Sequence, residues 1–346
     1  MAVSKSNLIY ALKHGKAVHI SEVESGLKCN CTCPACNEPL IARKGQKTMH
    51  HFAHKAKSEC EYGYQSSLHL AAKDILSEYK TIVLPEVAIN FYNHGGSYKF
   101  VKISDAKEIT FDRIVLEKKQ GDIIPDVIGY VGNKKIYIEI FVTHAIDENK
   151  LKRIKSENIS TIEIDLSDID RNISKEELTE MLLKDNPAKK WIYNKLENEW
   201  YNRFIKHSIK LMINGSRVYH CPKSKKKWKG PPYAVITLDC QECEYCTDIN
   251  YDYVRENNNY ILCSGKERIA EIEDFDIPLE KRIEITNAQL ERDAASKISQ
   301  FICPYCDGNL VIRESQYGEF LGCSNYPRCQ FSASINPETG EFKTRY

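Results

Sequence analysis

Four cysteines near the C-terminal end of the chain have the spacing of a structural zinc site. They follow the pattern C-x2-C-x16-C-x5-C and are Cys303, Cys306, Cys323 and Cys329. Zn²⁺ takes four ligands in tetrahedral geometry, so two pairs of thiolates can close one site. Residues 309–313 and 317–322, between the pairs, predict two short strands around a turn. We therefore predict a zinc ribbon over residues 299–346. The alternative is a metal site that only folds this segment.

The second pair of this site lies in the sequence Gly322-Cys-Ser-Asn-Tyr-Pro-Arg-Cys329-Gln-Phe. This sequence resembles the C-terminal zinc ribbon of bacterial type IA topoisomerases. The resemblance implies a module that contacts single-stranded DNA. It covers only the C-terminal ribbon, and nothing upstream resembles a topoisomerase. It therefore indicates a DNA-handling accessory module and leaves the chemistry of the chain to other residues.

The number and clustering of the cysteines predict the redox environment of the protein. The chain of 346 residues has 14 cysteines, clustered at 29–60, 221–263 and 303–329. Because the N-terminal sequence lacks the apolar core of a secretion signal, we expect metal thiolates in a reducing cytoplasm rather than disulfides. No apolar run is long enough to span a membrane. The formal net charge of +1 means that nucleic-acid binding needs a local basic patch.

The first cysteine cluster predicts a zinc site in an N-terminal ribbon over residues 1–62. A C-x2-C pair and a later histidine and cysteine supply the predicted ligands, which are Cys33, Cys36, His54 and Cys60. His51 could replace either member of the second pair. Cys29 and Cys31 are expected to be spare.

Several motifs follow this cysteine pair in a recognisable order. Leu40-Ile-Ala-Arg-Lys-Gly45, His50-His-Phe-Ala-His54 and Ser67-Leu-His-Leu-Ala-Ala-Lys73 precede a Pro-Asp pair and a strand that bears a glutamate. This order resembles the competence CoiA-like family, from about residue 17 to 165. The resemblance implies a nuclease-like domain of the PD-(D/E)xK class after the zinc ribbon.

The helix predicted at residues 65–79 could serve such a domain. It carries Gln65, His69 and Lys73 one turn apart, so the three side chains lie on neighbouring parts of one face. The resemblance implies Glu at the first of these positions, and Gln65 cannot supply charge to a metal. An ordinary solvated face is the alternative for the other two.

A hairpin supplies the carboxylates of the predicted catalytic site. The Gly132-Asn133 turn separates a strand that begins at Asp126 from a strand that bears Glu139. An Asp and a Glu on neighbouring strands can bind Mg²⁺ or Mn²⁺ together. Such a metal activates water for attack on a phosphodiester. If no metal binds, both residues are ordinary polar residues at a sheet edge.

The resemblance implies a lysine two residues after the glutamate, where this chain has Phe141. His144 and Lys150 lie nearest the end of the strand and are our candidates for the missing role. Lys134 and Lys135 are further alternatives. The predicted catalytic residues are Asp126, Glu139, His144 and Lys150.

The remaining pattern predicts an α/β (α+β) fold, with a restriction-endonuclease-like mixed sheet flanked by small zinc-ribbon modules. A helix after residue 147 and a strand at 160–166 make a crossover that completes a nuclease-like domain at 63–186. Residues 189–213 predict one long amphipathic helix inside a connecting segment, 187–215.

The middle cluster lies in a basic module at residues 216–270 and has one cysteine more than a tetrahedral site needs. The favoured ligands, with the choice of the omitted cysteine open, are Cys221, Cys243, Cys246 and Cys263. The predicted phosphate contacts, which could instead be a solvated loop, are Lys223, Lys225, Lys226, Lys227, Trp228 and Lys229. Residues 271–298 are expected to be an acidic linker.

Together these features predict a cytoplasmic, metal-dependent DNA nuclease with about three structural Zn²⁺ ions and a catalytic Mg²⁺ or Mn²⁺. Its expected partner is DNA, including single-stranded regions, with no membrane partner and with a protein partner in a DNA-processing complex as an open possibility. Competence, repair and defence against foreign DNA are settings that suit this activity. The competing hypothesis is a non-catalytic DNA-binding or recombination adaptor, because Gln65 and Phe141 weaken catalysis more than binding.

Overall fold

The computed structural model of the chain has two compact units. Its described residues are 8–47, 49–56, 60, 62–93, 97–143, 147–170, 172–221, 231, 233–241, 243–251, 259–265, 267, 269, 271–336, 339 and 341–344. One unit comprises Met1–Val87 with Ser104–Asn198, and the other comprises Ala88–Ile103 with Glu199–Tyr346. The expected N-terminal ribbon and nuclease-like domain therefore share the first unit, except for residues 88–103, which group with the second.

The N-terminal ribbon is a small five-stranded antiparallel sheet in the order β2-β1-β3-β4-β5. Its strands are β1 (Tyr10–Lys13), β2 (Lys16–His19), β3 (Gly26–Thr32), β4 (Pro39–Arg43) and β5 (His51–His54), with a 3-10 turn η1 at Ile20–Glu22. Cys29 and Cys31 are buried in its core beside Leu40 and Phe52. These two cysteines pack as small apolar side chains, as free cysteines commonly do.

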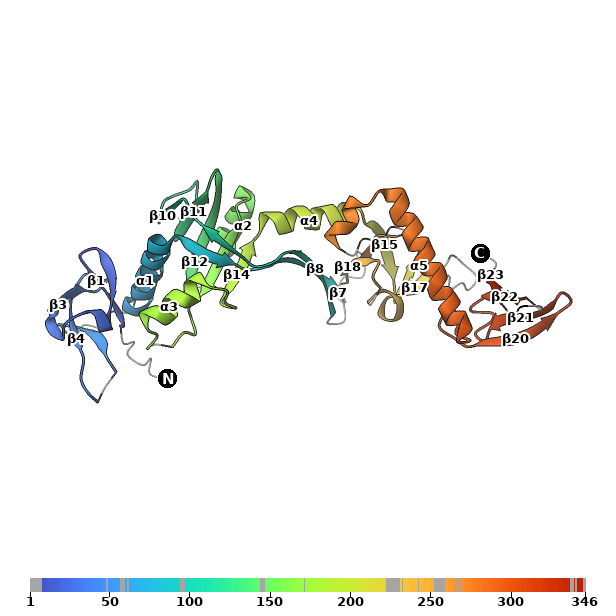
Figure 1. The fold of residues 1–346 in the computed structure, drawn as a ribbon, viewed down its shortest axis with the longest axis horizontal. Coiled ribbons are helices and arrows are strands. Elements are labelled where there is room, and N and C mark those ends of the chain that lie inside the picture. The colour runs from blue at the N-terminus through green and yellow to red at the C-terminus, as the bar shows by residue number, and fades with distance from the viewer. Residues whose placement is uncertain are drawn as a thin grey trace. The chain divides into compact units, whose positions relative to one another are not determined.

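A five-stranded mixed sheet forms the centre of the first unit (Figure 1). Its strands, in spatial order, are β10 (Arg113–Leu116), β11 (Val127–Val131), β12 (Lys134–Phe141), β13 (Thr161–Asp165) and β14 (Lys189–Tyr193). The β12–β13 pair is parallel and the other pairs are antiparallel. The mixed sheet and the flanking ribbons confirm the predicted α+β fold class. The Gly132-Asn133 turn joins β11 to β12, as the sequence predicts.

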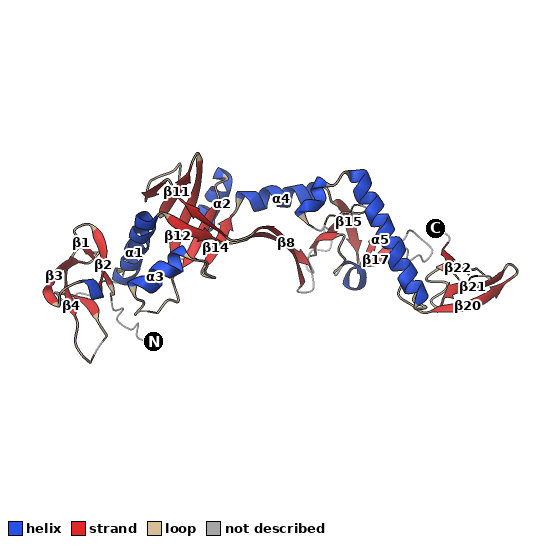
Figure 2. Cartoon of the chain, viewed as in Figure 1, coloured by secondary structure: helices blue, strands red, loops and turns tan. Residues whose placement is uncertain are grey.

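Helices cover both faces of this sheet (Figure 2). Helices α1 (Gly63–Tyr79) and α3 (Lys175–Leu183) share a core with Ile138 and Ile140 of β12. Helix α2 (Glu148–Glu157) packs its Ile154 against Tyr137, on the opposite face. Because side chains alternate along a strand, Glu139 points to the same face as Tyr137, toward α2.

Four further strands in this region form two separate pairs. Strand β6 (Thr81–Leu84) pairs with β9 (Lys107–Thr110), and β7 (Val87–Asn93) pairs with β8 (Ser97–Ser104). The second pair contributes Ile89, Phe91 and Val101 to a core in the second unit.

The prediction of one helix over 189–213 is wrong. The segment forms β14, then α4 (Lys195–Lys206), then β15 (Ile209–Asn214). Pairing with β13 holds the first part extended, and the Trp191 indole donates a hydrogen bond to the carbonyl of Pro85. The side chain of Asn194 then accepts a hydrogen bond from the Glu197 amide, which fixes the start of α4. An Asn followed three residues later by Glu is a helix-start signal that the sequence does contain.

The second unit contains another five-stranded sheet, in the order β17-β16-β15-β19-β18. Its other strands are β16 (Arg217–Tyr219), β17 (Tyr233–Val235), β18 (Cys246–Asn250) and β19 (Tyr260–Cys263), and a π-helical turn, η2, covers Ile236–Cys240. Phe204 of α4 packs against the core residues of the β7–β8 pair.

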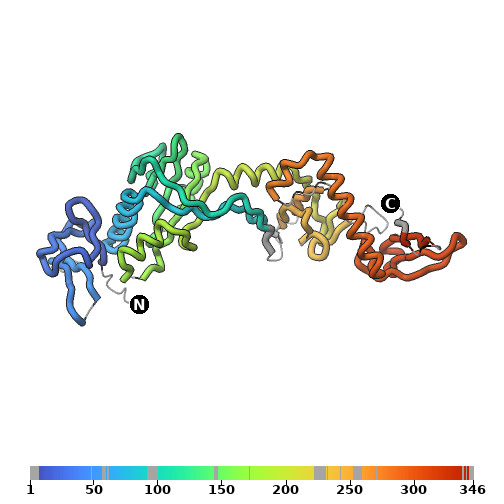
Figure 3. Tube along the Cα trace, viewed as in Figure 1, coloured from blue at the N-terminus to red at the C-terminus, as the bar shows by residue number. Residues whose placement is uncertain are grey.

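The C-terminal part is more helical than expected. The segment expected to be an acidic linker forms a 3-10 helix, η4 (Ile272–Asp276), and the 21-residue helix α5 (Leu279–Ser299). Ile298 at the end of α5 belongs to the core of the C-terminal ribbon, so tertiary packing stabilises this charged segment. The ribbon consists of β20 (Leu310–Ser315), β21 (Gly318–Cys323), β22 (Ser332–Ile335) and β23 (Phe342–Thr344), and Figure 3 traces the turn between the first two. Among the helices described, none is both long and apolar enough to cross a bilayer.

One glycine of the central sheet makes a close approach possible. A Cβ at Gly129 would lie 2.2 Å from a ring carbon of Phe111, which is buried in the core. Gly129→Ala is expected to lower the stability of the first unit by about 1–3 kcal/mol through overpacking. Hydrogen exchange of the β11 and β12 amides, followed by mass spectrometry, measures the loss. The double variant Gly129→Ala with Phe111→Leu should recover part of it, whereas strictly additive losses would contradict this steric explanation.

Candidate active site and metal centres

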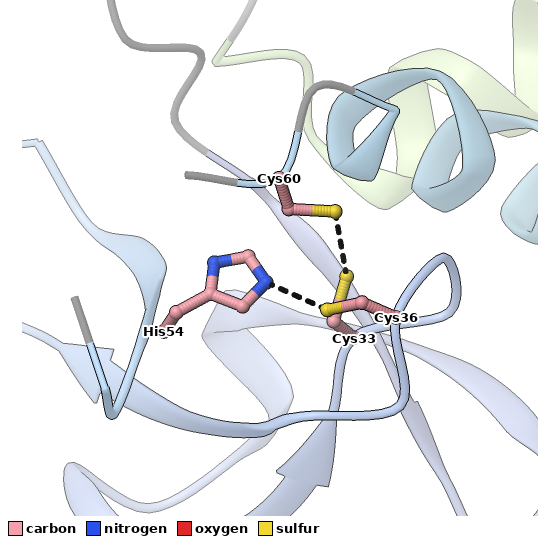
Figure 4. Close-up of side chains that lie close together, drawn as sticks. All are labelled: Cys33, Cys36, His54 and Cys60. Atoms are coloured by element: carbon pink, nitrogen blue, oxygen red, sulfur yellow. Dashed lines mark hydrogen bonds between the residues drawn. The ribbon is translucent and has the colours of Figure 1, made fainter. Parts of the chain in front are cut away.

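The four ligands predicted for the N-terminal zinc site come together around one point (Figure 4). The ligand atoms of Cys33, Cys36, His54 and Cys60 all lie within 4.8 Å of one another. The Sγ atom of Cys36 is 3.3 Å from Nε2 of His54, and the Sγ atoms of Cys33 and Cys60 are 3.9 Å apart. The alternative ligand His51 has its Nδ1 atom 2.8 Å from the carbonyl oxygen of Met49 and is not a member of the set.

The C-terminal ribbon gathers its four cysteines in the same way. The Sγ atoms of Cys303 and Cys329 are 3.6 Å apart, and those of Cys306 and Cys323 are 3.3 Å apart. Four thiol groups so close together are suited to a thiolate-binding cation, and tetrahedral Zn²⁺ is the ion that this donor set favours. Both sets are thus zinc sites of the structural type, with every ligand supplied by the protein.

The two sites share one local backbone conformation. The amide of Cys33 donates to the carbonyl of Glu38, and the amide of Cys303 donates to the carbonyl of Gly308. In each loop the residue after the second cysteine, Asn37 or Asp307, has a positive φ of 59° or 56°. Asn and Asp tolerate this left-handed conformation better than most residues. Residues close together in the sequence therefore determine the conformation of the first cysteine pair in each site.

The middle cysteines do not form a third set of equal compactness. Among the described residues, only the N-terminal and C-terminal clusters bring three or more possible ligand atoms within 4.8 Å of one another. All five cysteines of the middle cluster nevertheless belong to or pack against one core, whose cysteines are Cys221, Cys240, Cys243, Cys246 and Cys263.

Carboxylates and a lysine meet at the β11–β12 hairpin. The carboxylate of Asp126, just before β11, accepts a hydrogen bond of 2.9 Å from the amide of Ile140. The neighbouring Glu139 lies 4% exposed, and its Oε2 atom is 2.6 Å from Nζ of Lys150. Lys150 reaches this position from the first turn of α2. The hairpin and the crossover helix thus bring together three of the four residues predicted to be catalytic.

Burial dominates the electrostatics of Glu139. It raises the pKa of this carboxyl to about 7, Lys150 opposes the shift, and the negative charges of Asp126 and Glu163 add to it. Glu163 is the cross-strand neighbour of Glu139 in the parallel β12–β13 pair and forms an ion pair with Lys190. The second oxygen of Glu139, Oε1, is buried and makes no hydrogen bond to the part of the chain that is described.

Helix α1 adds polar groups on the other side of the same backbone segment. Nε2 of His69 lies 2.6 Å from the carbonyl oxygen of Ile140, whose amide is bonded to Asp126. Burial lowers the pKa of His69, so its neutral form is favoured and its ring nitrogen can donate to this carbonyl. Lys73 forms an ion pair of 2.6 Å with Glu117. Gln65, where the resemblance implies a glutamate, accepts a hydrogen bond of 2.7 Å from the hydroxyl of Thr143.

Two members of this polar cluster, Glu117 and Glu163, have no distinguishing sequence signal. The parallel register of β12 with β13 places Glu163 beside Glu139. Glu117 directly follows β10, has a positive φ and forms the ion pair with Lys73. His144 lies outside the described residues. The predicted phosphate contacts also lie outside them: Lys223, Lys225, Lys226, Lys227, Trp228 and Lys229.

Comparison with protein families identifies two segments of the chain. Residues 13–63 match the family described as competence protein CoiA, N-terminal domain. Residues 300–338 match the topoisomerase DNA binding C4 zinc finger. Both resemblances seen in the sequence are therefore confirmed for these segments. The predicted nuclease-like domain between them lies outside the two matches.

Similarity to individual proteins is limited in extent. The chain is 34% identical to DNA topoisomerase 1 of Archaeoglobus fulgidus over 117 residues, which are 31% of this chain and 17% of that protein. It is 35% identical to DNA topoisomerase 1 of Helicobacter pylori strain 26695 over 73 residues, 20% of this chain and 10% of that protein. With DNA topoisomerase 1 of Mycoplasmoides gallisepticum the identity is 59% over 29 residues, 8% of this chain and 4% of that protein. No solved structure matches the chain. The chain thus spans less than a fifth of each of these topoisomerases and shares with them a small module.

Proposed function

We propose that the protein is a divalent-metal-dependent DNA nuclease whose zinc ribbons hold the DNA. The observation that carries the proposal is the buried Glu139, which has Asp126 just before the adjoining strand β11 and Lys150 bonded to one carboxylate oxygen. An acidic pair can hold a divalent cation that activates water for phosphodiester hydrolysis, and the lysine in contact completes the acid–acid–lysine set that the resemblance implies.

The donor set at this hairpin fits a hard divalent cation. Oε1 of Glu139 is buried and makes no hydrogen bond within the described chain, and Asp126 is only half-buried, so both carboxylates have oxygen atoms to offer. Oxygen donors suit Mg²⁺ or Mn²⁺, whereas the cysteine sites suit Zn²⁺. A cation bound here would lower the pKa of a water molecule and offset the charge on the scissile phosphate.

The surrounding residues have distinct supporting tasks in this proposal. The resemblance implies a lysine at the position of Phe141, and in this proposal Lys150 takes over its role. The Lys150 ammonium reaches Glu139 from α2 instead of from the strand. Asp126 accepts a hydrogen bond from the amide of Ile140 and His69 bonds to the carbonyl oxygen of the same residue, so together they hold the backbone next to Glu139 in place. His69 is therefore a positioning residue. His144 remains a further candidate for the same reaction.

The proposed setting is DNA processing during competence. The family name attached to residues 13–63 supports competence, and the name attached to residues 300–338 supports DNA contact. The C-terminal ribbon exposes aromatic side chains, with Tyr317 90% and Tyr326 63% exposed. Such rings can stack on the bases of single strands. The basic run at residues 223–229 is proposed to bind phosphate groups, whatever the base sequence.

Isosteric substitution of the carboxylates tests the chemistry. Asp126→Asn and Glu139→Gln are each expected to lower Mn²⁺- or Mg²⁺-dependent cleavage of linear and single-stranded DNA by at least about 100-fold, because each removes a charged metal ligand. Lys150→Ala should also lower the cleavage rate. Glu148→Gln and Lys152→Ala on α2 are matched controls that should retain activity. Zinc content and DNA affinity should stay unchanged in every variant.

Two results would contradict this proposal. If the wild-type protein binds DNA but no divalent metal produces cleavage of any DNA substrate, the protein is a non-catalytic adaptor; the departures at Gln65 and Phe141 favour that alternative. If Glu139→Gln keeps full activity, cleavage comes from another site or from a contaminant.

Glu139 is expected to reduce the stability of the fold at neutral and alkaline pH. Its folded-state pKa of about 7 exceeds the ordinary value of 4.5, so its contribution is fully favourable below pH 4.5 and is lost as the pH rises through 7. Glu139→Gln should therefore raise the local stability of β12 at pH 8 by about 3 kcal/mol and leave it nearly unchanged at pH 4.5. Hydrogen exchange of the β12 amides at the two pH values measures this. Equal stability of both proteins at pH 8 would contradict the raised pKa.

Stacking on the C-terminal ribbon is tested with the exposed tyrosines. Tyr317→Ala and Tyr326→Ala should each weaken binding of single-stranded DNA by roughly 10-fold, since a stacked base contributes about 1–3 kcal/mol. Fluorescence anisotropy with a labelled oligonucleotide provides the affinity. Tyr79→Ala, which removes a 49% exposed tyrosine from α1, is the control. Equal losses in all three variants would rule out a stacking surface on this ribbon.

A further inference from the structure

The sheet of the second unit has one face that neither the zinc sites nor the proposed active site uses. Side chains alternate along a strand, so the neighbours of a buried residue point to the opposite face. Ile213, Val218 and Ile261 are buried in one core, against which Leu290 of α5 also packs. The opposite face of β15, β16, β17 and β19 is the outer face of this sheet.

Three tyrosines and a methionine form a row across the outer face. Tyr260 of β19 is the cross-strand partner of Met212 of β15, and Tyr219 of β16 is the partner of Tyr233 of β17. The antiparallel register of β15 with β16 continues the row from Met212 to Tyr219. Met212 is 51% exposed, and the three tyrosines are partly exposed. Aromatic rings that reach solvent in a row can stack on successive bases of a single strand.

Two basic side chains flank this row. Lys210 lies on β15, and its Nζ atom is 4.0 Å from the centre of the Tyr260 ring. Arg217 begins β16, and its guanidinium carbon is 4.8 Å from the centre of the Tyr233 ring. Because β15 and β16 run antiparallel, the two cations lie on opposite sides of the row. Contact with an aromatic ring holds each cation at the sheet and leaves its charge in place.

The charge on this face is suited to a polyanion. Lys210 and Arg217 are exposed, and neither forms an ion pair with a residue in the described part of the chain. Strand β18, at the edge of the sheet, carries one acidic residue, Asp248. Asp248 is half-buried, and its carboxylate accepts a hydrogen bond of 2.9 Å from the amide of Ile249. Positive charge on both sides of a row of rings matches the phosphates and bases of a nucleic acid strand.

We propose that the outer face binds single-stranded DNA, with bases stacked along the row and phosphate groups held by Lys210 and Arg217. This inference rests on the proposed function for the identity of the nucleic acid, and it adds a binding surface outside both zinc ribbons. A single strand fits because the bases of a duplex are stacked on one another and leave no ring face for a tyrosine. A protein partner could contact the same rings, but cations on both sides of the row favour phosphate.

Binding of a labelled single-stranded oligonucleotide to the full-length protein, without divalent metal, tests this surface. Tyr260→Leu should weaken binding by roughly 10-fold, whereas Tyr260→Phe should bind like the wild type because it keeps the ring. Arg217→Ala should weaken binding and reduce the slope of log affinity against log salt by about 0.7, the value for one phosphate contact on a single strand. Arg292→Ala, at an exposed position of α5, is the matched control and should change neither quantity.

Several outcomes would overturn this surface. Wild-type affinity in either Tyr260→Leu or Arg217→Ala contradicts it. Equal losses in Tyr260→Leu and Tyr260→Phe, or equal losses of single-stranded and duplex binding in Tyr260→Leu, contradict stacking. If Tyr260→Leu fails to fold, Met212→Glu decides, because it places a negative charge at an exposed position of the row: weaker binding supports the surface and unchanged binding overturns it. Cleavage does not enter these measurements, so a wild-type protein that cuts no DNA would contradict the nuclease proposal alone.

Discussion

The metal site of the N-terminal ribbon is the constraint on which the first unit depends. Cys60, its fourth ligand, lies three residues before the start of α1 at Gly63. A Cβ at Gly63 would lie 3.4 Å from Sγ of Cys60 and 3.6 Å from Sγ of Cys33, so the helix begins in close contact with the metal ligands. Helix α1 then brings His69 to the Ile140 carbonyl, beside Glu139. Metal binding in the ribbon therefore fixes the start of a helix that shapes the candidate active site.

Burial of Glu139 is the main energetic cost at that site. A carboxyl group in an apolar setting loses hydration, and one ion pair to Lys150 compensates for only part of that loss. A glutamine would fill the same volume without the charge. Retaining an ionisable group at a stability cost is typical of catalytic and metal-binding positions, where the chemistry needs the carboxylate. The same burial limits solvent screening, so the charges of Asp126, Lys150 and Glu163 act strongly on this group.

The differences between the sequence-based expectations and the fold have identifiable physical causes. An aromatic stripe over residues 189–213 has helical spacing, but pairing of β14 with β13 makes part of it a strand because tertiary contacts outweigh local propensity. The acidic segment before the C-terminal ribbon is part of a helix because Ile298 anchors its end in a core that lies later in the chain. In the middle cluster, spacing alone cannot choose among five cysteines, and all five belong to or pack against one core.

The sequence by itself determined the features that local spacing controls. The C-x2-C pairs, the Gly132-Asn133 hairpin and the crossover into α2 all follow from residues within a few positions of one another. Only the tertiary structure decided which residues from distant parts of the chain contact these features. Lys150 contacts Glu139 because a crossover helix packs on that face, and Glu163 lies beside it because two strands pair in parallel. Such contacts depend on the strand register and on the packing between separate segments. Neither follows from the spacing of residues along the sequence.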